Sequence, residues 1–198
     1  MAKVVVEKPQ IISLLYKQEE TDEDYGSCLW ARFYLDLKNY TMTIESDCGN
    51  YTYGWTPTPA HESFLHLCAR FNKDYLLCKF SSRTVLDHAT TYKRAIEAVK
   101  EALEYTCMSL EQDERKELYE EIKDACYSYE TEQGVYIELS DVLNDIEGLR
   151  GEFDFETIAG LIETDYPRMA KKIVEVYDLH IKPVVKELAK EGADNETD

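Results

Sequence analysis

Basic residues are scarce in this sequence: 22 lysines and arginines stand against 40 aspartates and glutamates, and the formal net charge is −18. Long apolar runs are missing too, since no stretch approaches the ~20 residues that span a bilayer. The N-terminal segment MAKVVVEKPQ has no apolar run of signal-peptide length. The anionic inner leaflet of a membrane repels so acidic a surface. We therefore expect a cytoplasmic protein that does not bind membranes.

Signatures of catalysis are also missing. The chain has no G-x-S-x-G elbow, no phosphate-binding loop, no G-x-G-x-x-G and no H-E-x-x-H. Its 40 carboxylates guarantee close acidic pairs by chance, so such pairs do not by themselves indicate general acid–base catalysis. We expect no catalytic residues, no cofactor and no enzymatic activity.

Metal-binding motifs are missing despite six cysteines, which we interpret as buried thiols of a reducing compartment. Neither a Cys-x-x-Cys nor a histidine pair at i, i+4 spacing occurs among the candidate zinc ligands, which are Cys48, His61, His66, Cys68 and Cys78. A calcium loop fails as well, because Gly148 as its sixth residue puts Leu143 at the first ligand position, and Gly151 puts Ile146 there. No metal site is predicted.

Alternating apolar residues dominate the first third of the chain. Segment 29–37, LWARFYLDL, alternates between an apolar and a more polar face, and segments 41–46 and 51–55 alternate after intervening turn residues. Segments 3–7 and 11–16 add one or two further strands. The sequence therefore predicts an antiparallel meander of three to five strands.

Helical spacing replaces this alternation after Trp55. Thr58 as N-cap and Pro59 in the first turn predict the start of a helix, and a short apolar stretch, DYLLCKF, follows it. Apolar stripes predict further helices over 90–110, 118–129, 153–163, 168–180 and 184–191, with an interruption or kink at Pro183. The segment GVYIEL, 134–139, fits either a short strand or the entry to a helix.

No repeat, low-complexity linker or Gly/Ser hinge divides the chain. We therefore expect one α+β domain over 1–198, in which an N-terminal antiparallel β-sheet packs against a mainly helical C-terminal half. Its expected parts are the sheet at 1–56, helices packed on the sheet at 57–110, an acidic helical part at 111–192 and a frayed tail at 193–198.

The excess negative charge is concentrated in one segment. Residues 101–166 carry 20 acidic and 4 basic side chains, whereas residues 1–100 carry 13 and 12. Lys and Arg make the phosphate contacts of nucleic-acid-binding proteins, so direct binding to nucleic acid is disfavoured. Two interpretations remain: an ordinary solvated face, or a surface that occupies the basic groove another protein keeps for DNA or RNA. The acidic residues predicted to bind such a partner are Glu111, Asp113, Glu114, Glu120, Glu121, Asp124, Asp141, Asp145, Glu147, Glu152, Asp154 and Glu156.

A second candidate surface is aromatic. Tyr51, Tyr53 and Trp55 alternate on one predicted strand, and aromatic side chains at that spacing either anchor a partner or form part of the core. We include all three among the candidate partner-binding residues and leave both interpretations open.

The segment NYTYGW, followed by ESFLHLCARFNKDYLLCKF, resembles a pattern in small uncharacterised proteins of phages and prophages. The matching positions cover about a third of the chain and are Tyr53, Trp55, Phe64, Leu65, Asp74, Tyr75, Leu76 and Lys79. The resemblance implies a phage or mobile-element origin. Small acidic phage proteins include anti-CRISPR and anti-restriction inhibitors, which bind nucleic-acid-handling enzymes, some of them as DNA mimics.

Charge and resemblance together suggest a non-enzymatic, anti-CRISPR-like inhibitor in the host cell cytosol. Its expected partner is a basic nucleic-acid-binding host protein, such as a CRISPR nuclease or surveillance complex, whose access to DNA or RNA it blocks. The sequence is compatible with inhibition by nucleic-acid mimicry and with inhibition by blocking a movement of the target. It also leaves open whether the protein is a homodimer. The alternatives are a phage-encoded enzyme that modifies a host component and a structural or regulatory phage protein.

Overall fold

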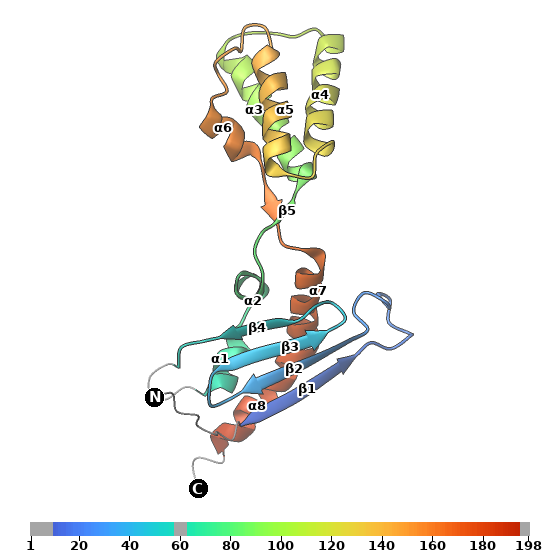
Figure 1. Cartoon of the computed structure of the whole chain (residues 1–198), viewed down its shortest axis with the longest axis vertical. Helices are drawn as coiled ribbons and strands as arrows, with labels where there is room; N and C mark the ends of the chain where they lie inside the picture. The colour runs from blue at the N-terminus through green and yellow to red at the C-terminus, as the bar shows by residue number, and fades with distance from the viewer. Residues whose placement is uncertain (1–9, 58–62, 195–198) are drawn as a thin grey trace, which may run out of the picture. The chain divides into compact units, whose positions relative to one another are not determined.

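The computed structural model describes residues 10–57 and 63–194, and it divides the chain into two compact units (Figure 1). The sheet unit comprises the residues up to Ser82 and those from Tyr166 onward, and the helical unit is Arg83–Asp165. Each unit has its own cluster of buried apolar residues. The sequence predicts one continuous domain, whereas these contacts place the acidic helices around a separate core.

The sheet unit contains a four-stranded antiparallel meander in the order β1-β2-β3-β4. Its strands are β1 (Ile11–Lys17), β2 (Trp30–Asp36), β3 (Thr41–Ser46) and β4 (Tyr51–Gly54). The alternation in β2 buries Ala31, Phe33 and Leu35, and the register sets Phe33 opposite Ile44 and Leu35 opposite Met42. The predicted α+β fold with an N-terminal antiparallel sheet is confirmed. The predicted strand at 3–7 lies outside the described residues.

Helices from two separate stretches of the sequence pack against this sheet (Figure 1). They are α1 (Phe64–Arg70), α2 (Lys73–Phe80), α7 (Arg168–Val176) and α8 (Lys182–Asp194). Ser63 is the N-cap of α1, its Oγ accepting the His66 N–H. The caps predicted at Thr58 and Pro59 lie outside the described residues, as do 195–198 of the predicted frayed tail. The other two tail residues belong to α8.

The predicted interruption at Pro183 is a π-helical turn, η1 (Tyr177–Ile181), and the chain stays helical through it. The Lys182 N–H bonds to the Tyr177 carbonyl, five residues earlier, just before the proline, which has no N–H to donate. The buried Tyr177 side chain donates its hydroxyl to the Cys68 carbonyl at 2.8 Å. The turn therefore connects the C-terminal helices to α1.

An aromatic cluster joins β4 to α1 and α2. Trp55 is only 9% exposed, stacks on Phe71 at a ring separation of 4.8 Å, and donates its Nε1–H to the Tyr75 hydroxyl at 2.7 Å. Tyr51 and Tyr53 are half-buried against the same core. Trp55 is therefore a core residue that a partner cannot reach. Of the two interpretations left open by the sequence, core or interface, the core position applies to this residue.

The helical unit consists of α3 (His88–Tyr105), α4 (Gln112–Tyr127), α5 (Glu132–Asp145) and α6 (Phe155–Leu161). Its core includes Val99 of α3, Ile122 of α4 and Leu139 of α5. The expectation that all helices of 57–110 pack on the sheet is therefore corrected for α3, whose buried stripe belongs to this second core. No helix among the described residues is long and apolar enough to cross a membrane.

One helix boundary differs from the sequence prediction, and one segment that the sequence left open is settled. The apolar stripe of α3 was expected to continue through Cys107 and Leu110, but Cys107 takes a left-handed φ of 54° and Met108 bonds back to the Leu103 carbonyl at 2.9 Å. This pattern ends a helix in a Schellman motif. The ambiguous segment 134–139 is helical, and Thr131 caps its helix by accepting the Gly134 N–H.

The two ends of the helical unit are joined by a short antiparallel ladder between β5 (Val85–Leu86) and β6 (Thr164–Asp165). The Asp87 N–H bonds to the Glu163 carbonyl at 2.9 Å, and the Glu163 N–H bonds to the Thr91 hydroxyl at 3.0 Å. Arg94 forms an ion pair with the Glu163 carboxylate. The helical unit therefore begins and ends at one place, as expected for a segment inserted within another fold.

Replacing Trp55 should destabilise the sheet unit. Trp55→Ala removes a buried ring, so we expect a loss of about 3–5 kcal/mol in the free energy of unfolding. Trp30→Ala, on an indole that is 39% exposed, is the matched control and should cost less than about 1 kcal/mol. Urea titration followed by far-ultraviolet circular dichroism measures both. Equal losses would contradict the core position of Trp55.

Removing the Thr91 hydroxyl should loosen the junction of β5 and β6. Thr91 is 1% exposed, so Thr91→Val leaves the Glu163 N–H without its acceptor at nearly constant volume, at an expected cost of about 1–2 kcal/mol. Thr84→Val, at an exposed position next to β5, is the control. Hydrogen exchange of the Glu163 amide should accelerate only in Thr91→Val, and unchanged exchange there would count against this contact.

Candidate functional site

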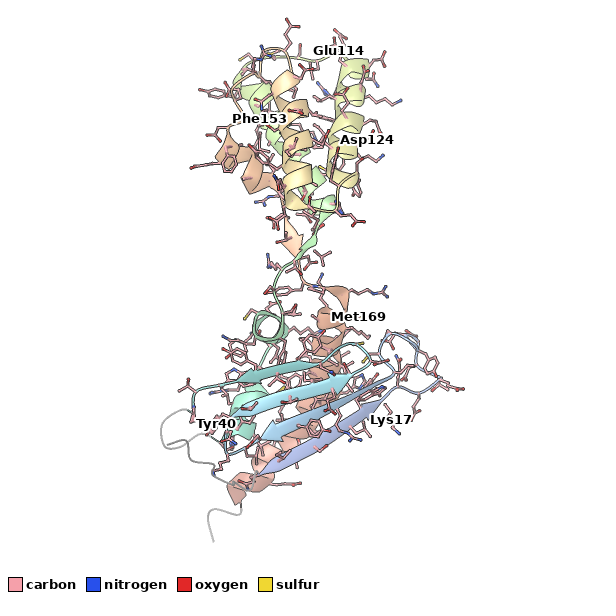
Figure 2. All side chains as sticks on the ribbon, viewed as in Figure 1. Lys17, Tyr40, Glu114, Asp124, Phe153 and Met169 are labelled. Atoms are coloured by element: carbon pink, nitrogen blue, oxygen red, sulfur yellow. The ribbon has the colours of Figure 1, made fainter. Side chains whose placement is uncertain are left out.

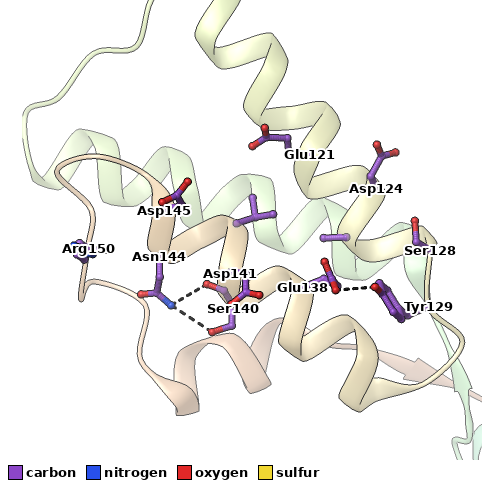
Figure 3. Close-up of a pocket in the computed structure, with 12 residues that line it drawn as sticks. Glu121, Asp124, Ser128, Tyr129, Glu138, Ser140, Asp141, Asn144, Asp145 and Arg150 are labelled. Atoms are coloured by element: carbon purple, nitrogen blue, oxygen red, sulfur yellow. Dashed lines mark hydrogen bonds between the residues drawn. The ribbon is translucent and has the colours of Figure 1, made fainter.

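An acidic groove runs between α4 and α5 in the helical unit, with a volume of about 780 Å³ (Figure 3). Its lining residues are Glu121, Asp124, Ala125, Ser128, Tyr129, Glu138, Ser140, Asp141, Val142, Asn144, Asp145 and Arg150. A second groove of about 240 Å³ lies on the same helix pair and shares Glu121, Val142 and Asp145 with the first. Its other lining residues are Leu110, Glu114, Glu117, Leu118, Ile146 and Glu147. Both grooves are therefore built from the most acidic part of the chain.

Helical periodicity places the carboxylates of each wall in a row. On α4, Glu121 and Asp124 are one turn apart, while Ile122 beside them points into the core. On α5, Asp141 and Asp145 are one turn apart, and Glu138 precedes them by another turn. Figure 3 shows the two rows on their separate helices. The same amphipathic pattern that buries the apolar stripes thus fixes the spacing of the acids.

Most carboxylates of the main groove form no ion pair with a described residue. Glu121, Asp124, Asp141 and Asp145 are exposed and make no hydrogen bond or ion pair to another described residue. Arg150 is the one basic residue in the lining of this groove. Like charges one turn apart repel each other, so this arrangement destabilises the isolated helices. A bound cationic group would relieve that repulsion.

Polar groups on the groove wall are partly paired with one another. The Tyr129 hydroxyl donates to Glu138 Oε1 at 2.7 Å, and this bond to a carboxylate raises the pKa of Tyr129. The Asn144 amide donates to the Ser140 carbonyl at 2.9 Å (Figure 3). These bonds hold the wall in place and leave the remaining carboxylate oxygens available to Lys or Arg side chains of a partner.

The structure brings together half of the acidic residues predicted from sequence. Glu121, Asp124, Asp141 and Asp145 line the main groove, and Glu114 and Glu147 line the second one. Figure 2 shows Glu114 and Asp124 on α4. The others lie elsewhere on the helical unit and are Glu111, Asp113, Glu120, Glu152, Asp154 and Glu156. Sequence reasoning missed Glu117 and Glu138, although the spacing of the α5 acids would have included Glu138 once that segment was known to be helical.

Several predicted residues have a local structural role. Asp154 caps α6, with its Oδ1 accepting the Thr157 N–H at 2.8 Å, and bonds from Thr157 lower the pKa of Asp154. Glu114 accepts the Glu111 N–H at 2.9 Å at the start of α4. Glu120 is paired with Lys123 at 3.1 Å. These carboxylates are less available to a partner than those of the main groove.

The cysteines differ from the prediction in two places. Cys28, Cys48, Cys68 and Cys126 are buried as expected, but Cys78 and Cys107 are exposed. Of the residues considered as zinc ligands in the sequence, Cys68 lies in the core, and His61 falls outside the described residues. The described residues contain one group with metal-ligand geometry, Cys28, Asp47 and Cys48, two members of which sequence reasoning left out of the ligand pool.

The model of the phage protein family Phage_phiTE_072 matches residues 5–189, which include parts of both units. The chain belongs to this phage family. The match confirms the phage origin that the resemblance implied. Searches of curated proteins and of solved structures returned no match. Partner and mechanism of this phage protein are therefore inferred below from the geometry of the groove.

Replacing Asp154 should destabilise α6 in a pH-dependent way. Asp154→Ala removes the cap, so the free energy of unfolding should fall at neutral pH, whereas Glu156→Ala, in the same turn, should leave it nearly unchanged. Because the folded state lowers the pKa of Asp154, its contribution is present above about pH 4 and is lost as the pH falls through the lowered value.

Urea titrations of wild type and both variants at pH 7 and pH 2 measure this difference. The gap between wild type and Asp154→Ala should shrink at the lower pH. A gap of equal size at both pH values would show that Asp154 does not act through its charged carboxylate.

Proposed function

We propose that this phage protein is a non-enzymatic counter-defence inhibitor that binds a basic, nucleic-acid-binding host effector through the acidic groove of its helical unit. One observation carries the proposal: two rows of carboxylates flank a groove, and four of these groups have no hydrogen-bond or ion-pair partner among the described residues. A protein surface that normally holds phosphates carries Lys and Arg at comparable density. The groove offers such a surface a replacement for nucleic acid.

Rigid placement supports mimicry over non-specific attraction. Glu121 and Asp124 stand on a helix whose neighbouring residues Ile122, Ala125 and Cys126 are buried, so their backbone is fixed before binding. Preorganised groups lose less conformational entropy on binding than groups on a disordered tail. Long-range attraction between the acidic unit and a basic partner also accelerates their encounter.

The groove rim supplies apolar contact area as well as charge. Tyr129 lines the groove and is 38% exposed. Tyrosine is enriched at protein interfaces because its ring buries a large area while its hydroxyl keeps a polar contact. Together with Ala125 and Val142, which line the groove, this ring provides the contact that charge alone does not.

The proposed partner is an RNA-guided CRISPR nuclease or surveillance complex in the host cytoplasm. Such an effector holds its nucleic acids in positively charged channels. The phage family supports a role against the host, and the sign of the charge selects a basic target. In this proposal the protein contacts neither nucleic acid nor a membrane, and the block is steric occlusion of the channel.

Reversing two groove charges should weaken inhibition. Asp124→Lys with Asp141→Lys changes one carboxylate on each wall, and we expect the association rate with the target to fall roughly tenfold or more. Glu20→Lys with Glu23→Lys makes the same change in net charge at exposed positions of the sheet unit and is the control.

The measurement begins with capture from a bacterial lysate by the tagged full-length protein, with elution by salt. The recovered nuclease or complex is then purified, and its DNA binding is titrated with wild type and both variants. Stoichiometric, salt-sensitive inhibition that only the groove variant loses would support the proposal. Full inhibition by the groove variant would refute it, and time-dependent inactivation at substoichiometric amounts would favour an enzyme instead.

A further inference from the structure

Two buried thiols and a carboxylate meet at one end of the sheet. Cys28 lies before β2, whereas Asp47 and Cys48 lie in the turn between β3 and β4. Their ligand atoms all lie within 4.8 Å of one another. Cys28 and Cys48 are 0% and 4% exposed, while Asp47 is exposed. The group therefore combines a buried sulfur pair with an open side at the carboxylate.

We propose that Cys28, Asp47 and Cys48 form a binding site for a thiophilic divalent cation of the Zn²⁺ class, with water as the fourth ligand. Thiolate sulfur and carboxylate oxygen are both common ligands of Zn²⁺, and three protein ligands with one open position are a recurring arrangement. Hard cations such as Mg²⁺ and Ca²⁺ prefer all-oxygen sites, so the sulfur pair selects against them.

The spacing of the donor atoms fits tetrahedral coordination. With a metal–sulfur bond of about 2.3 Å and a metal–oxygen bond of about 2.0 Å, a sulfur and an oxygen ligand lie about 3.5 Å apart on a tetrahedron. The Cys28 Sγ to Asp47 Oδ1 distance is 3.5 Å. The Cys28 thiol lies within hydrogen-bond distance of Asp47 Oδ1 and of the Trp30 carbonyl, and the Cys48 thiol within that distance of the Ser27 carbonyl. Metal binding would replace the two thiol protons and release them to solvent.

Hydrogen bonds already orient the proposed ligands. Asp47 Oδ2 accepts the Leu29 N–H at 2.8 Å, and Oδ1, which faces the Cys28 sulfur, also accepts the Trp30 N–H at 3.4 Å. The Cys48 carbonyl accepts the Tyr51 hydroxyl at 3.0 Å, and the Cys48 N–H bonds to the Ser46 hydroxyl at 3.2 Å. Partners of this kind hold ligands in position and raise metal affinity. Ligands from two segments are therefore positioned before a metal arrives.

The charge balance also suits a divalent cation. Two thiolates and one carboxylate carry three negative charges, so a bound M²⁺ leaves one negative charge. Lys172 lies close enough to Cys48 for an electrostatic interaction, and its side chain is only 17% exposed. Its ammonium group also forms ion pairs with Asp24 and Glu175, so it offsets the remaining charge only in part. By contrast, no metal-ligand cluster forms around the equally buried Cys68 and Cys126 anywhere in the described residues.

A bound metal would connect the segment before β2 to the turn after β3, where a cytoplasmic protein cannot rely on a disulfide. With three protein ligands the affinity should be lower than that of a closed four-cysteine site. The site belongs to the sheet unit and does not depend on the proposed role of the acidic groove.

Cobalt binding tests the site, because Co²⁺ takes tetrahedral Zn²⁺ positions and its thiolate complexes absorb visible light. Full-length protein, kept reduced and with all six thiols titrating in denaturant, is titrated with Co²⁺ and then with Zn²⁺. We expect one Co²⁺ per chain, a thiolate-to-metal charge-transfer band, displacement by Zn²⁺, and a higher midpoint of thermal unfolding with Zn²⁺.

Cys28→Ser and Cys48→Ser should each lower Co²⁺ affinity by more than about 100-fold, and Asp47→Asn should lower it by about 10–100-fold. Cys78→Ser and Cys107→Ser, at exposed thiols, are the controls and should bind as wild type does. Circular dichroism checks that each variant is folded. If Cys28→Ser or Cys48→Ser unfolds the protein, Asp47→Asn still tests the site, because Asp47 is exposed. The proposal is overturned if the wild-type protein shows no charge-transfer band. It is also overturned if the band persists in Asp47→Asn, Cys28→Ser and Cys48→Ser.

Discussion

The burial of apolar side chains between α4 and α5 is the interaction on which the acidic groove depends. Residues 83–165 carry 22 acidic and 8 basic side chains, so their charges oppose the approach of these two helices. Ile122 of α4 and Leu139 and Leu143 of α5 are fully buried, and burying each contributes roughly 1.5–3 kcal/mol. This core holds two repelling rows of carboxylates at a fixed separation. The groove thus exists because apolar burial between α4 and α5 outweighs the repulsion between the two rows of carboxylates.

Most of the residues that carry the phage resemblance pack in or beside the aromatic cluster of the sheet unit, whereas Asp74 is exposed in the first turn of α2. Trp55 bonds to Tyr75 and packs on Phe64, and Lys79 lies over the rings of Tyr53 and Tyr75 at 5.0 and 5.3 Å. The pattern is therefore explained by packing, with a cation–π contact at its edge. The sequence pattern reflects how two short helices, α1 and α2, pack against the sheet. For this reason it indicates a family and no particular activity.

Much of the fold follows from the sequence because alternation and helical stripes report directly on burial. The alternation in β2 places Phe33 and Leu35 on the buried face, and the stripe of α4 correctly includes Leu118 and Ile122. Periodicity shows that an apolar stripe of a helix is buried, but it does not show which other elements the stripe packs against. For that reason α3 was assigned to the nearby sheet, although Val99 and Leu103 pack in the second core.

The sites were harder to predict for a related reason. Glu138 was missed because periodicity left segment 134–139 open between a strand and a helix, and the Thr131 cap shows that it is a helix. The sulfur pair was missed because Cys28 and Cys48 are far apart in the chain. They become neighbours only through the β2–β3 register, which sets Ala31 opposite Ser46. The first gap is local, because Thr131 lies only three residues from the amide that it caps, whereas the second depends on long-range strand pairing.

The ladder of β5 and β6 has an evolutionary consequence. Because the helical unit starts and finishes at paired strands, a gene segment encoding residues 83–165 can be lost, exchanged or duplicated while strand order β1-β2-β3-β4 and its covering helices keep their hydrogen bonds. Its surface can therefore diversify under selection independently of the sheet unit.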